Sequence, residues 1–229
     1  MGKTIEKIAL QRGHNIVETI DVGEEFKFNS ETFLNTDVAL EFTNPQSAEN
    51  NIKKCLEKGI SVVSGTTGWK FNKNEIAEIC MKNNCAFFYA SNFSIGMNIF
   101  FEINKNLAQL LNNQDSYNVK IEETHHIHKL DKPSGTAITL ADAIIENSDK
   151  YKNWELDKYV ADTISIKSFR EGEVVGEHKI VWDSEIDTIS IQHAAKSRDG
   201  FACGAVLSAE FLKNKIGVFS MQDLLFKTN

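Results

Sequence analysis

Short apolar runs alternate with amphipathic segments through residues 1–90, and this alternation restricts the fold more than any other feature of the sequence. Glycines stand where two of the helical patterns stop, at Gly13 and Gly59. The periodicity predicts helices at 3–11, 46–58 and 74–83, and strands at 14–21, 37–43, 60–64 and 85–90. Strands and helices in such alternation are typical of a Rossmann-type α/β fold, a doubly wound parallel sheet with helices on both faces.

The pattern changes after residue 96. Helical periodicity covers 97–111 and 134–147, with a strand at 117–123 between them. Three strand-like runs then follow one another at 163–170, 173–182 and 188–193. Consecutive strands without intervening helices predict a second, α+β domain with an open and mostly antiparallel sheet. Helices at 205–213 and 220–225 end the chain, and the expected domains are 1–96 with 207–229, and 97–206.

A doubly wound dinucleotide-binding domain normally opens with a strand, a glycine-rich turn and a helix, and here the pattern begins with the helix. The first strand belongs in the middle of such a sheet, so its loss would leave buried backbone groups unpaired on two neighbours. We therefore expect Met1-Gly2 to be the end of a glycine turn, with about a dozen further residues upstream. The alternative is a sheet that begins with the strand at 15–21.

Composition and charge exclude several classes of protein. The formal net charge of −7 argues against a nucleic-acid partner, which favours a basic surface. No run of about eighteen apolar residues is present, so no membrane-spanning helix is expected. The N-terminus lacks the apolar core of a signal peptide, and the four cysteines form no CxxC pair. Free thiols in a reducing cytoplasm are therefore expected.

The most informative stretch is residues 122–137, which read Glu-Glu-Thr-His-His-Ile-His-Lys-Leu-Asp-Lys-Pro-Ser-Gly-Thr-Ala. Its histidines lie between a predicted strand and a predicted helix, and strand ends face the ligand-binding edge of such folds. Successive strand residues point to opposite faces, so one of His125 and His126 can face a substrate while the other supports it. Lys129 can donate a proton, and Ser134-Gly135-Thr136 forms an anion site at a helix start. A substrate that carries carboxylates fits this arrangement.

Two other interpretations of this stretch involve no catalysis. Imidazole is a zinc ligand, but His-His-x-His lacks the i,i+4 spacing and the nearby cysteine of typical zinc sites, so no metal is expected. A polar solvated loop is the second interpretation, and the Pro-Ser-Gly-Thr helix start disfavours it.

The run 125–137 resembles the signature of the dihydrodipicolinate reductase family. Further segments resemble the family in the same order, namely 65–68, 90–98, 172–178 and 193–205. The resemblance covers essentially the whole chain, and it also accounts for the unusual start, because the family opens with a strand and a Gly-x-x-Gly-x-Met-Gly turn. It implies reduction of 4-hydroxy-tetrahydrodipicolinate to tetrahydrodipicolinate with NADH or NADPH, in diaminopimelate and lysine biosynthesis.

The resemblance also implies roles for individual residues. His125 corresponds to the proton donor and acceptor of the family, and Lys129 to a second proton donor. His126, Gly135 and Thr136 correspond to substrate-binding residues. Asp131 either tunes Lys129 or caps the following helix, and capping is favoured.

The cofactor residues follow from the same resemblance. Asp21 ends a predicted strand where an acid accepts hydrogen bonds from the adenosine ribose, and no arginine beside it would receive a 2′-phosphate, which favours NADH. The segments expected near the nicotinamide are Gly65, Thr66 and Thr67, and Ala90, Ser91, Asn92 and Phe93. The family further implies that 1–96 with 207–229 binds the cofactor, and that 97–206 binds the substrate and assembles a homotetramer.

Two alternative functions are open. Another two-domain NAD(P)-dependent amino-acid dehydrogenase would share the fold, but it is not expected to carry the His-His-x-His-Lys run. A non-catalytic binding protein, degenerate in its cofactor site, would have no physical need for both His125 and Lys129.

Overall fold

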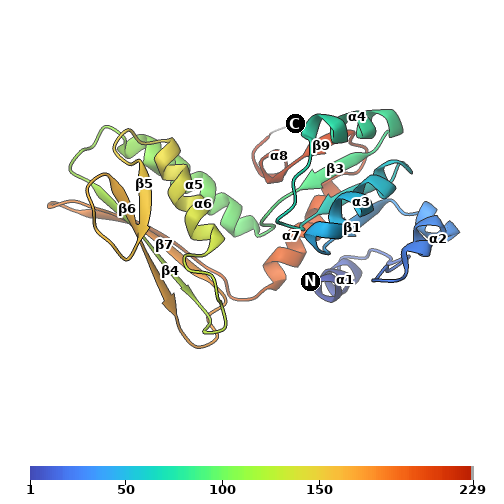
Figure 1. The fold of residues 1–229 in the computed structure, drawn as a ribbon, viewed down its shortest axis with the longest axis horizontal. Helices are drawn as coiled ribbons and strands as arrows, with labels where there is room; N and C mark the ends of the chain where they lie inside the picture. The colour runs from blue at the N-terminus through green and yellow to red at the C-terminus, as the bar shows by residue number, and fades with distance from the viewer. Residues whose placement is uncertain (228–229) are drawn as a thin grey trace. The chain divides into compact units, whose positions relative to one another are not determined.

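The computed structural model describes residues 1–227, which form two compact units (Figure 1). Unit 1 contains Met1–Ile95 and the chain from Asp199 onward, and unit 2 contains Gly96–Arg198. No helix in the described part of the chain is long and apolar enough to cross a membrane.

Unit 1 is a parallel sheet with helices on both faces. Its strands are ordered β1-β2-β3-β9, and every pairing between them is parallel. Val62 and Phe87 point to one face, where α3 and α4 pack, and Val63 and Phe88 point to the other, where α1 and α7 pack. The predicted doubly wound fold is therefore confirmed. The elements are α1 (Gly2–Gln11), β1 (Val38–Glu41), α3 (Pro45–Leu56), β2 (Ser61–Ser64), α4 (Lys73–Asn83), β3 (Ala86–Tyr89), α7 (Asp199–Phe211), β9 (Gly217–Phe219) and α8 (Met221–Leu225).

Local sequence explains where the unit 1 helices begin. The side chain of Asn44 accepts hydrogen bonds from the N–H groups of Gln46 and Ser47, and Pro45 occupies the first turn of α3. Asn72 caps α4 in the same way. Both caps follow the carboxyl end of a strand, so they fix the loops that leave β1 and β2.

The strand predicted at 14–21 is wrong. These residues form no helix or strand, and η1 (Glu25–Asn29) and α2 (Glu31–Leu34) follow them. A strand is stabilised by pairing with a neighbouring strand. Within the described residues β1 is the edge of the sheet, so residues 14–21 do not pair with it. Ile16 and Ile20 still pack against the cores on the two faces of the sheet, which explains the apolar alternation that suggested a strand.

Unit 2 is an open sheet covered on one face by two helices. Its strands are ordered β5-β6-β4-β7-β8. The sheet is mixed, because the pairs β5–β6 and β4–β6 are parallel and the other two pairs are antiparallel. Helix α6 follows β4 in the chain and returns it so that β6 can run parallel to β4. β5 and β9 are short and were not predicted. The elements are α5 (Ile95–Leu111), β4 (Asn118–His125), α6 (Gly135–Glu146), β5 (Asn153–Leu156), β6 (Thr163–Arg170), β7 (Glu177–Asp183) and β8 (Thr188–Ala194).

Strand β4 lies in the middle of this sheet and alternates strictly between buried and more exposed residues. Its buried face begins with Val119 and Ile121, which belong to the core under α5 and α6. The same face ends with Glu123 and His125, both buried. The hydrophobic core therefore gives way to a polar cluster at the carboxyl end of β4.

Candidate active site

The polar cluster extends across the sheet of unit 2. Glu123 pairs in register with Ser168 of β6 on one side and with His178 of β7 on the other. His178 in turn pairs with His193 of β8. Residues directly opposite one another share a face of the sheet, so these side chains form a row on the face that α6 covers.

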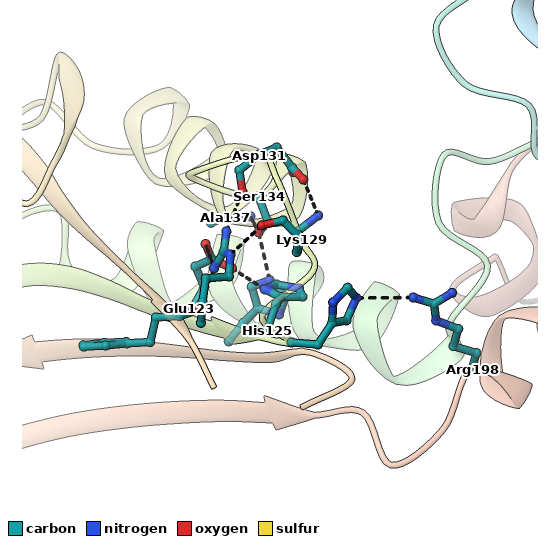
Figure 2. A network of polar contacts seen from close by, with 11 residues as sticks. Glu123, His125, Lys129, Asp131, Ser134, Ala137 and Arg198 are labelled. Atoms are coloured by element: carbon teal, nitrogen blue, oxygen red, sulfur yellow. Dashed lines mark hydrogen bonds and ion pairs between the residues drawn. The ribbon is translucent and has the colours of Figure 1, made fainter. Parts of the chain in front are cut away.

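Glu123 lies beside His125 in the cluster (Figure 2), and it also contacts Arg170. Its Oε2 is in direct contact with Nδ1 of His125, and its Oε1 accepts a hydrogen bond of 3.0 Å from Nη1 of Arg170. The Glu123 side chain is fully buried. Burial by itself raises the pKa of Glu123, but the interactions with His125, Ser168 and Arg170 outweigh it and hold the pKa at about 2. Glu123 is therefore an ionised carboxylate at neutral pH.

His178 lies on the other side of His125. The two rings meet edge to face with their centroids 5.1 Å apart. Burial and the neighbouring charge of His125 lower the pKa of His178 to about 3, so His178 is neutral at physiological pH. Its Nε2 lies 3.2 Å from Oγ of Ser134, the N-cap residue of α6, whose hydroxyl also accepts from the N–H of Ala137. His178 therefore connects the β-sheet to the start of α6.

The loop after β4 carries Lys129, whose Nζ donates to Oδ1 of Asp131 at 2.8 Å. This hydrogen bond lowers the pKa of Asp131. The predicted capping role of Asp131 is wrong, because Ser134 occupies the N-cap of α6. Arg170 holds this loop through its backbone, since its guanidinium donates to the carbonyl oxygens of Lys129 and Asp131.

The residues predicted to bind the substrate lie around the same strand end. The strand ends at His125, and the ring of His126 turns toward Arg198, whose Nη2 is 3.4 Å from Nε2 of His126. Gly135 and Thr136 form the first turn of α6, where backbone N–H groups and the helix dipole favour an anion. An imidazole, a guanidinium and a helix N-terminus thus occur in one unit with His125 and Lys129.

Glu123, His125 and His178 each offer a ligand atom, and these atoms all lie within 4.8 Å of one another. However, Oε2 of Glu123 is already in contact with Nδ1 of His125, and Oε1 accepts from Arg170. Both oxygens of Glu123 are therefore engaged by protein groups, and Nε2 of His178 lies 3.2 Å from Oγ of Ser134.

Unit 1 contains a cavity of about 460 Å³ at the carboxyl ends of β1, β2 and β3. Of the residues predicted to bind the cofactor, all but Ala90 and Asp21 line this cavity. Ala90 is buried, and Asp21 is exposed, with its Oδ1 accepting from the N–H of Val22. Sequence reasoning did not single out the lining segment 42–45. The lining residues are Met1, Phe42, Thr43, Asn44, Pro45, Gly65, Thr66, Thr67, Ser91, Asn92, Phe93 and Phe201.

A buried carboxylate, Glu41, holds two of the loops that line the cavity. Its Oε1 accepts from Oγ1 of Thr66 at 3.0 Å, from the N–H of Thr43 at 3.2 Å and from the Thr43 hydroxyl, and its Oε2 accepts from Oγ of Ser64 at 2.7 Å. Thr43 N also donates to Oγ1 of Thr66 at 2.9 Å. The hydroxyl of Thr66 thus faces the protein and fixes the loop shape.

The cavity suits a flat heteroaromatic ring with amide substituents. Gly65 brings the backbone close to Phe42, because a Cβ at this position would lie 2.1 Å from Cε1 of that ring. Backbone and amide groups from the 43–45, 65–67 and 91–93 segments supply donors and acceptors beside the rings of Phe42 and Phe93. A reduced nicotinamide, with one apolar ring and one carboxamide, fits this combination.

Sequence comparison finds relatives of one kind along nearly the whole chain. The family models for the N-terminus and the C-terminus of dihydrodipicolinate reductase match residues 1–93 and 96–225. The 4-hydroxy-tetrahydrodipicolinate reductase of Christiangramia forsetii is 48% identical over 225 residues, which cover 98% of this chain and 93% of that protein. The enzyme of the same name from Neisseria meningitidis serogroup B is 34% identical over 85% of this chain and 74% of its own length.

Structure comparison confirms the fold. The dipicolinate-bound dihydrodipicolinate reductase from Paenisporosarcina sp. TG-14 superposes with a TM-score of 0.73 at 23% sequence identity. The match covers 98% of this chain and 95% of that one.

Proposed function

The chain belongs to the dihydrodipicolinate reductase family, and from this premise we propose that it reduces 4-hydroxy-tetrahydrodipicolinate to tetrahydrodipicolinate with NADH or NADPH, with His125 and Lys129 handling the protons. The observation that carries the proposal is the polar cluster of unit 2. There the end of β4 presents His125, backed by the ionised Glu123, and Arg170 ties Glu123 to the loop that bears Lys129.

The cavity of unit 1 is the proposed cofactor site. When bound there, the reduced nicotinamide supplies the hydride. The Gly65–Thr67 and Ser91–Phe93 segments would hold the cofactor's nicotinamide end, beside the 43–45 loop that Glu41 fixes. Phe42 and Phe93, whose centroids are 5.4 Å apart, exclude water from the apolar part of the pocket.

Unit 2 binds the dicarboxylate substrate. Its carboxylates are recognised by His126, with Arg198 beside it, and by the N–H groups of Gly135 and Thr136 at the start of α6. The overall reaction consumes one hydride and one proton, and the 4-hydroxyl group leaves as water. His125 supplies or removes a proton at the ring, and Lys129 acts as the second donor.

The experiment is a reductase assay on substrate generated by the preceding synthase, in which consumption of the reduced cofactor is followed. His125→Gln is expected to lower kcat by about 10² to 10⁴-fold, the range that general acid–base catalysis contributes. His14→Gln is the matched control, because His14 is an exposed histidine of unit 1 that pairs with Glu210. Full activity of the His125 variant, or no activity of the folded parent protein, would contradict the proposal.

NADH is the proposed preferred cofactor. Asp21 is followed by Val22, and no arginine beside it would receive the 2′-phosphate of NADPH. The carboxylate of Asp21 is exposed and therefore accessible to ribose hydroxyls. A ratio of kcat/KM for NADH over NADPH above one supports this preference, and Asp21→Asn is expected to lower the ratio.

The chain is further proposed to assemble as a homotetramer in the cytoplasm. No helix within residues 1–227 covers the sheet face of unit 2 opposite α5 and α6, and Phe169 on this face is 42% exposed. Two such faces can bury one another as packed sheets do. The free thiols of Cys55, Cys80, Cys85 and Cys203 are consistent with a reducing compartment.

A further inference from the structure

A neutral histidine carries its hydrogen on one ring nitrogen, and which nitrogen this is decides where the ring can accept a proton. We propose that Glu123 is a positioning residue that holds His125 with its hydrogen on Nδ1, so that Nε2 is the nitrogen that exchanges protons with the substrate. The inference rests on the proposed role of His125. It assigns a function to a buried carboxylate that touches no expected substrate atom.

The strand geometry brings the two side chains together. Glu123 and His125 are two positions apart on β4, so they lie on the same face, and Oε2 of Glu123 contacts Nδ1 of His125 (Figure 2). An ionised carboxylate only accepts hydrogen bonds. Because Glu123 is ionised, the contact is favourable only when Nδ1 carries hydrogen, in the neutral ring as well as in the charged one.

The other nitrogen of His125 borders a space kept open by glycine. A Cβ on Gly176 would lie 3.1 Å from Nε2 and 3.3 Å from Cδ2 of the His125 ring. Any larger residue there would crowd this edge of the imidazole. The ring therefore has Nδ1 in contact with a carboxylate, and Nε2 beside a position where only glycine leaves it uncrowded.

Arg170 occupies one oxygen of Glu123 and leaves the other for His125. Its Nη1 donates to Oε1, while its Nε and Nη2 donate to the carbonyls of Lys129 and Asp131. The Arg170 side chain is 9% exposed and its guanidinium is anchored at several points, so it cannot easily turn away from Oε1. Oε2 is consequently left for His125.

The same anchoring predicts the result of an isosteric substitution. In Glu123→Gln, Arg170 still requires an acceptor and binds the amide oxygen. The amide nitrogen then faces Nδ1 of His125 and donates to it, which moves the ring hydrogen to Nε2. The shape of the site is preserved, while the nitrogen that should accept a proton no longer has a free lone pair.

The experiment measures the ring hydrogens directly on the full chain labelled with ¹⁵N in its histidine rings, at a pH where the rings are neutral. His125 signals are assigned from the spectrum of His125→Gln. The parent protein is expected to show hydrogen on Nδ1 of His125, and Glu123→Gln to show it on Nε2. Glu122→Gln is the matched control, because Glu122 is the preceding residue on the opposite face and pairs with Lys120; it is expected to leave the His125 signals unchanged.

Steady-state kinetics give the second readout. Glu123→Gln is expected to lower kcat by about 10²-fold or more with little change in KM, and Glu123→Asp, which keeps the acceptor, to recover part of the loss. Hydrogen on Nε2 of His125 in the parent protein, or full kcat in Glu123→Gln, would overturn the inference, and the first of these does not depend on the folding of Glu123→Gln. If the parent protein does not reduce the substrate but the ring hydrogen of His125 moves from Nδ1 to Nε2 in Glu123→Gln as expected, the proposed function fails and the positioning contact stands.

Discussion

Replacing Glu41 perturbs the loops of the proposed cofactor cavity without touching the cavity lining itself. Glu41 accepts hydrogen bonds from Ser64, Thr43 and Thr66, and Ser64 and Thr66 are buried. In Glu41→Ala these hydroxyls lose their acceptor. Each buried polar group left unpaired costs about 1–3 kcal/mol, so the two buried hydroxyls give an expected loss of unfolding free energy of about 2–6 kcal/mol. In Glu41→Gln the amide oxygen keeps the contacts of Oε1 and only the Ser64 bond reverses, so the expected loss is about 1–2 kcal/mol.

The assay for these variants is urea unfolding at pH 7, combined with a titration of NADH binding. Trp69 is a local reporter, because its Nε1 donates to the carbonyl of Thr66 at 2.8 Å. Both variants are expected to bind NADH more weakly, and Glu41→Ala more so. Glu49→Gln is the control, an exposed glutamate on α3 expected to change stability by less than about 0.5 kcal/mol. A loss below about 1 kcal/mol in Glu41→Ala, or unchanged NADH affinity, would refute the anchoring role.

Three further predictions concern unit 2. Gly176→Ala is expected to lower kcat/KM by crowding Nε2 of His125, whereas Gly200→Ala, whose added Cβ meets no atom within 4 Å, is expected to leave it unchanged. The depressed pKa of Glu123, about 2 against 4.5, contributes roughly 3 kcal/mol of stability that is present above pH 4.5 and is lost as the pH falls toward 2. In urea unfolding, the free energy of unfolding is therefore expected to decrease less between pH 7 and pH 3 for Glu123→Gln than for the parent protein. Phe169→Lys is expected to reduce a particle of four times the 25.8 kDa chain mass to smaller species in light scattering, and an unchanged mass would place the interface elsewhere.

The sequence was sufficient to predict helices whose first residues contain a local capping signal. Asn44-Pro45 and Asn72 begin helices through local caps, and the helices at α3 and α4 were predicted within a few residues. The strand predicted at 14–21 fails for the opposite reason. Its apolar alternation reflects packing of Ile16 and Ile20, and only a neighbouring strand, which no local pattern reveals, makes a strand of such a segment.

In the candidate site, too, contacts within one strand could be predicted from the sequence, and contacts between strands could not. Contact between Glu123 and His125 follows from two-residue periodicity, so this pair was open to prediction from sequence. Arg170 and His178 come from β6 and β7, and their places depend on the register of those strands with β4. Glu41 likewise acquires its role through Thr66, twenty-five positions away in the chain.

The cluster around Glu123 is better explained by chemistry than by stability. A buried ion pair stabilises a fold little more than apolar residues of similar size would, because desolvation of both ions offsets their attraction. The buried face of β4 offers such residues at Val119 and Ile121, and the same pattern continued for two more positions would have extended the core under α6. Instead the face ends in a carboxylate and an imidazole whose atoms depend on Arg170 for their orientation. The fold therefore places His125, the proposed proton donor and acceptor, at the point where the core under α6 ends and the loop that bears Lys129 begins.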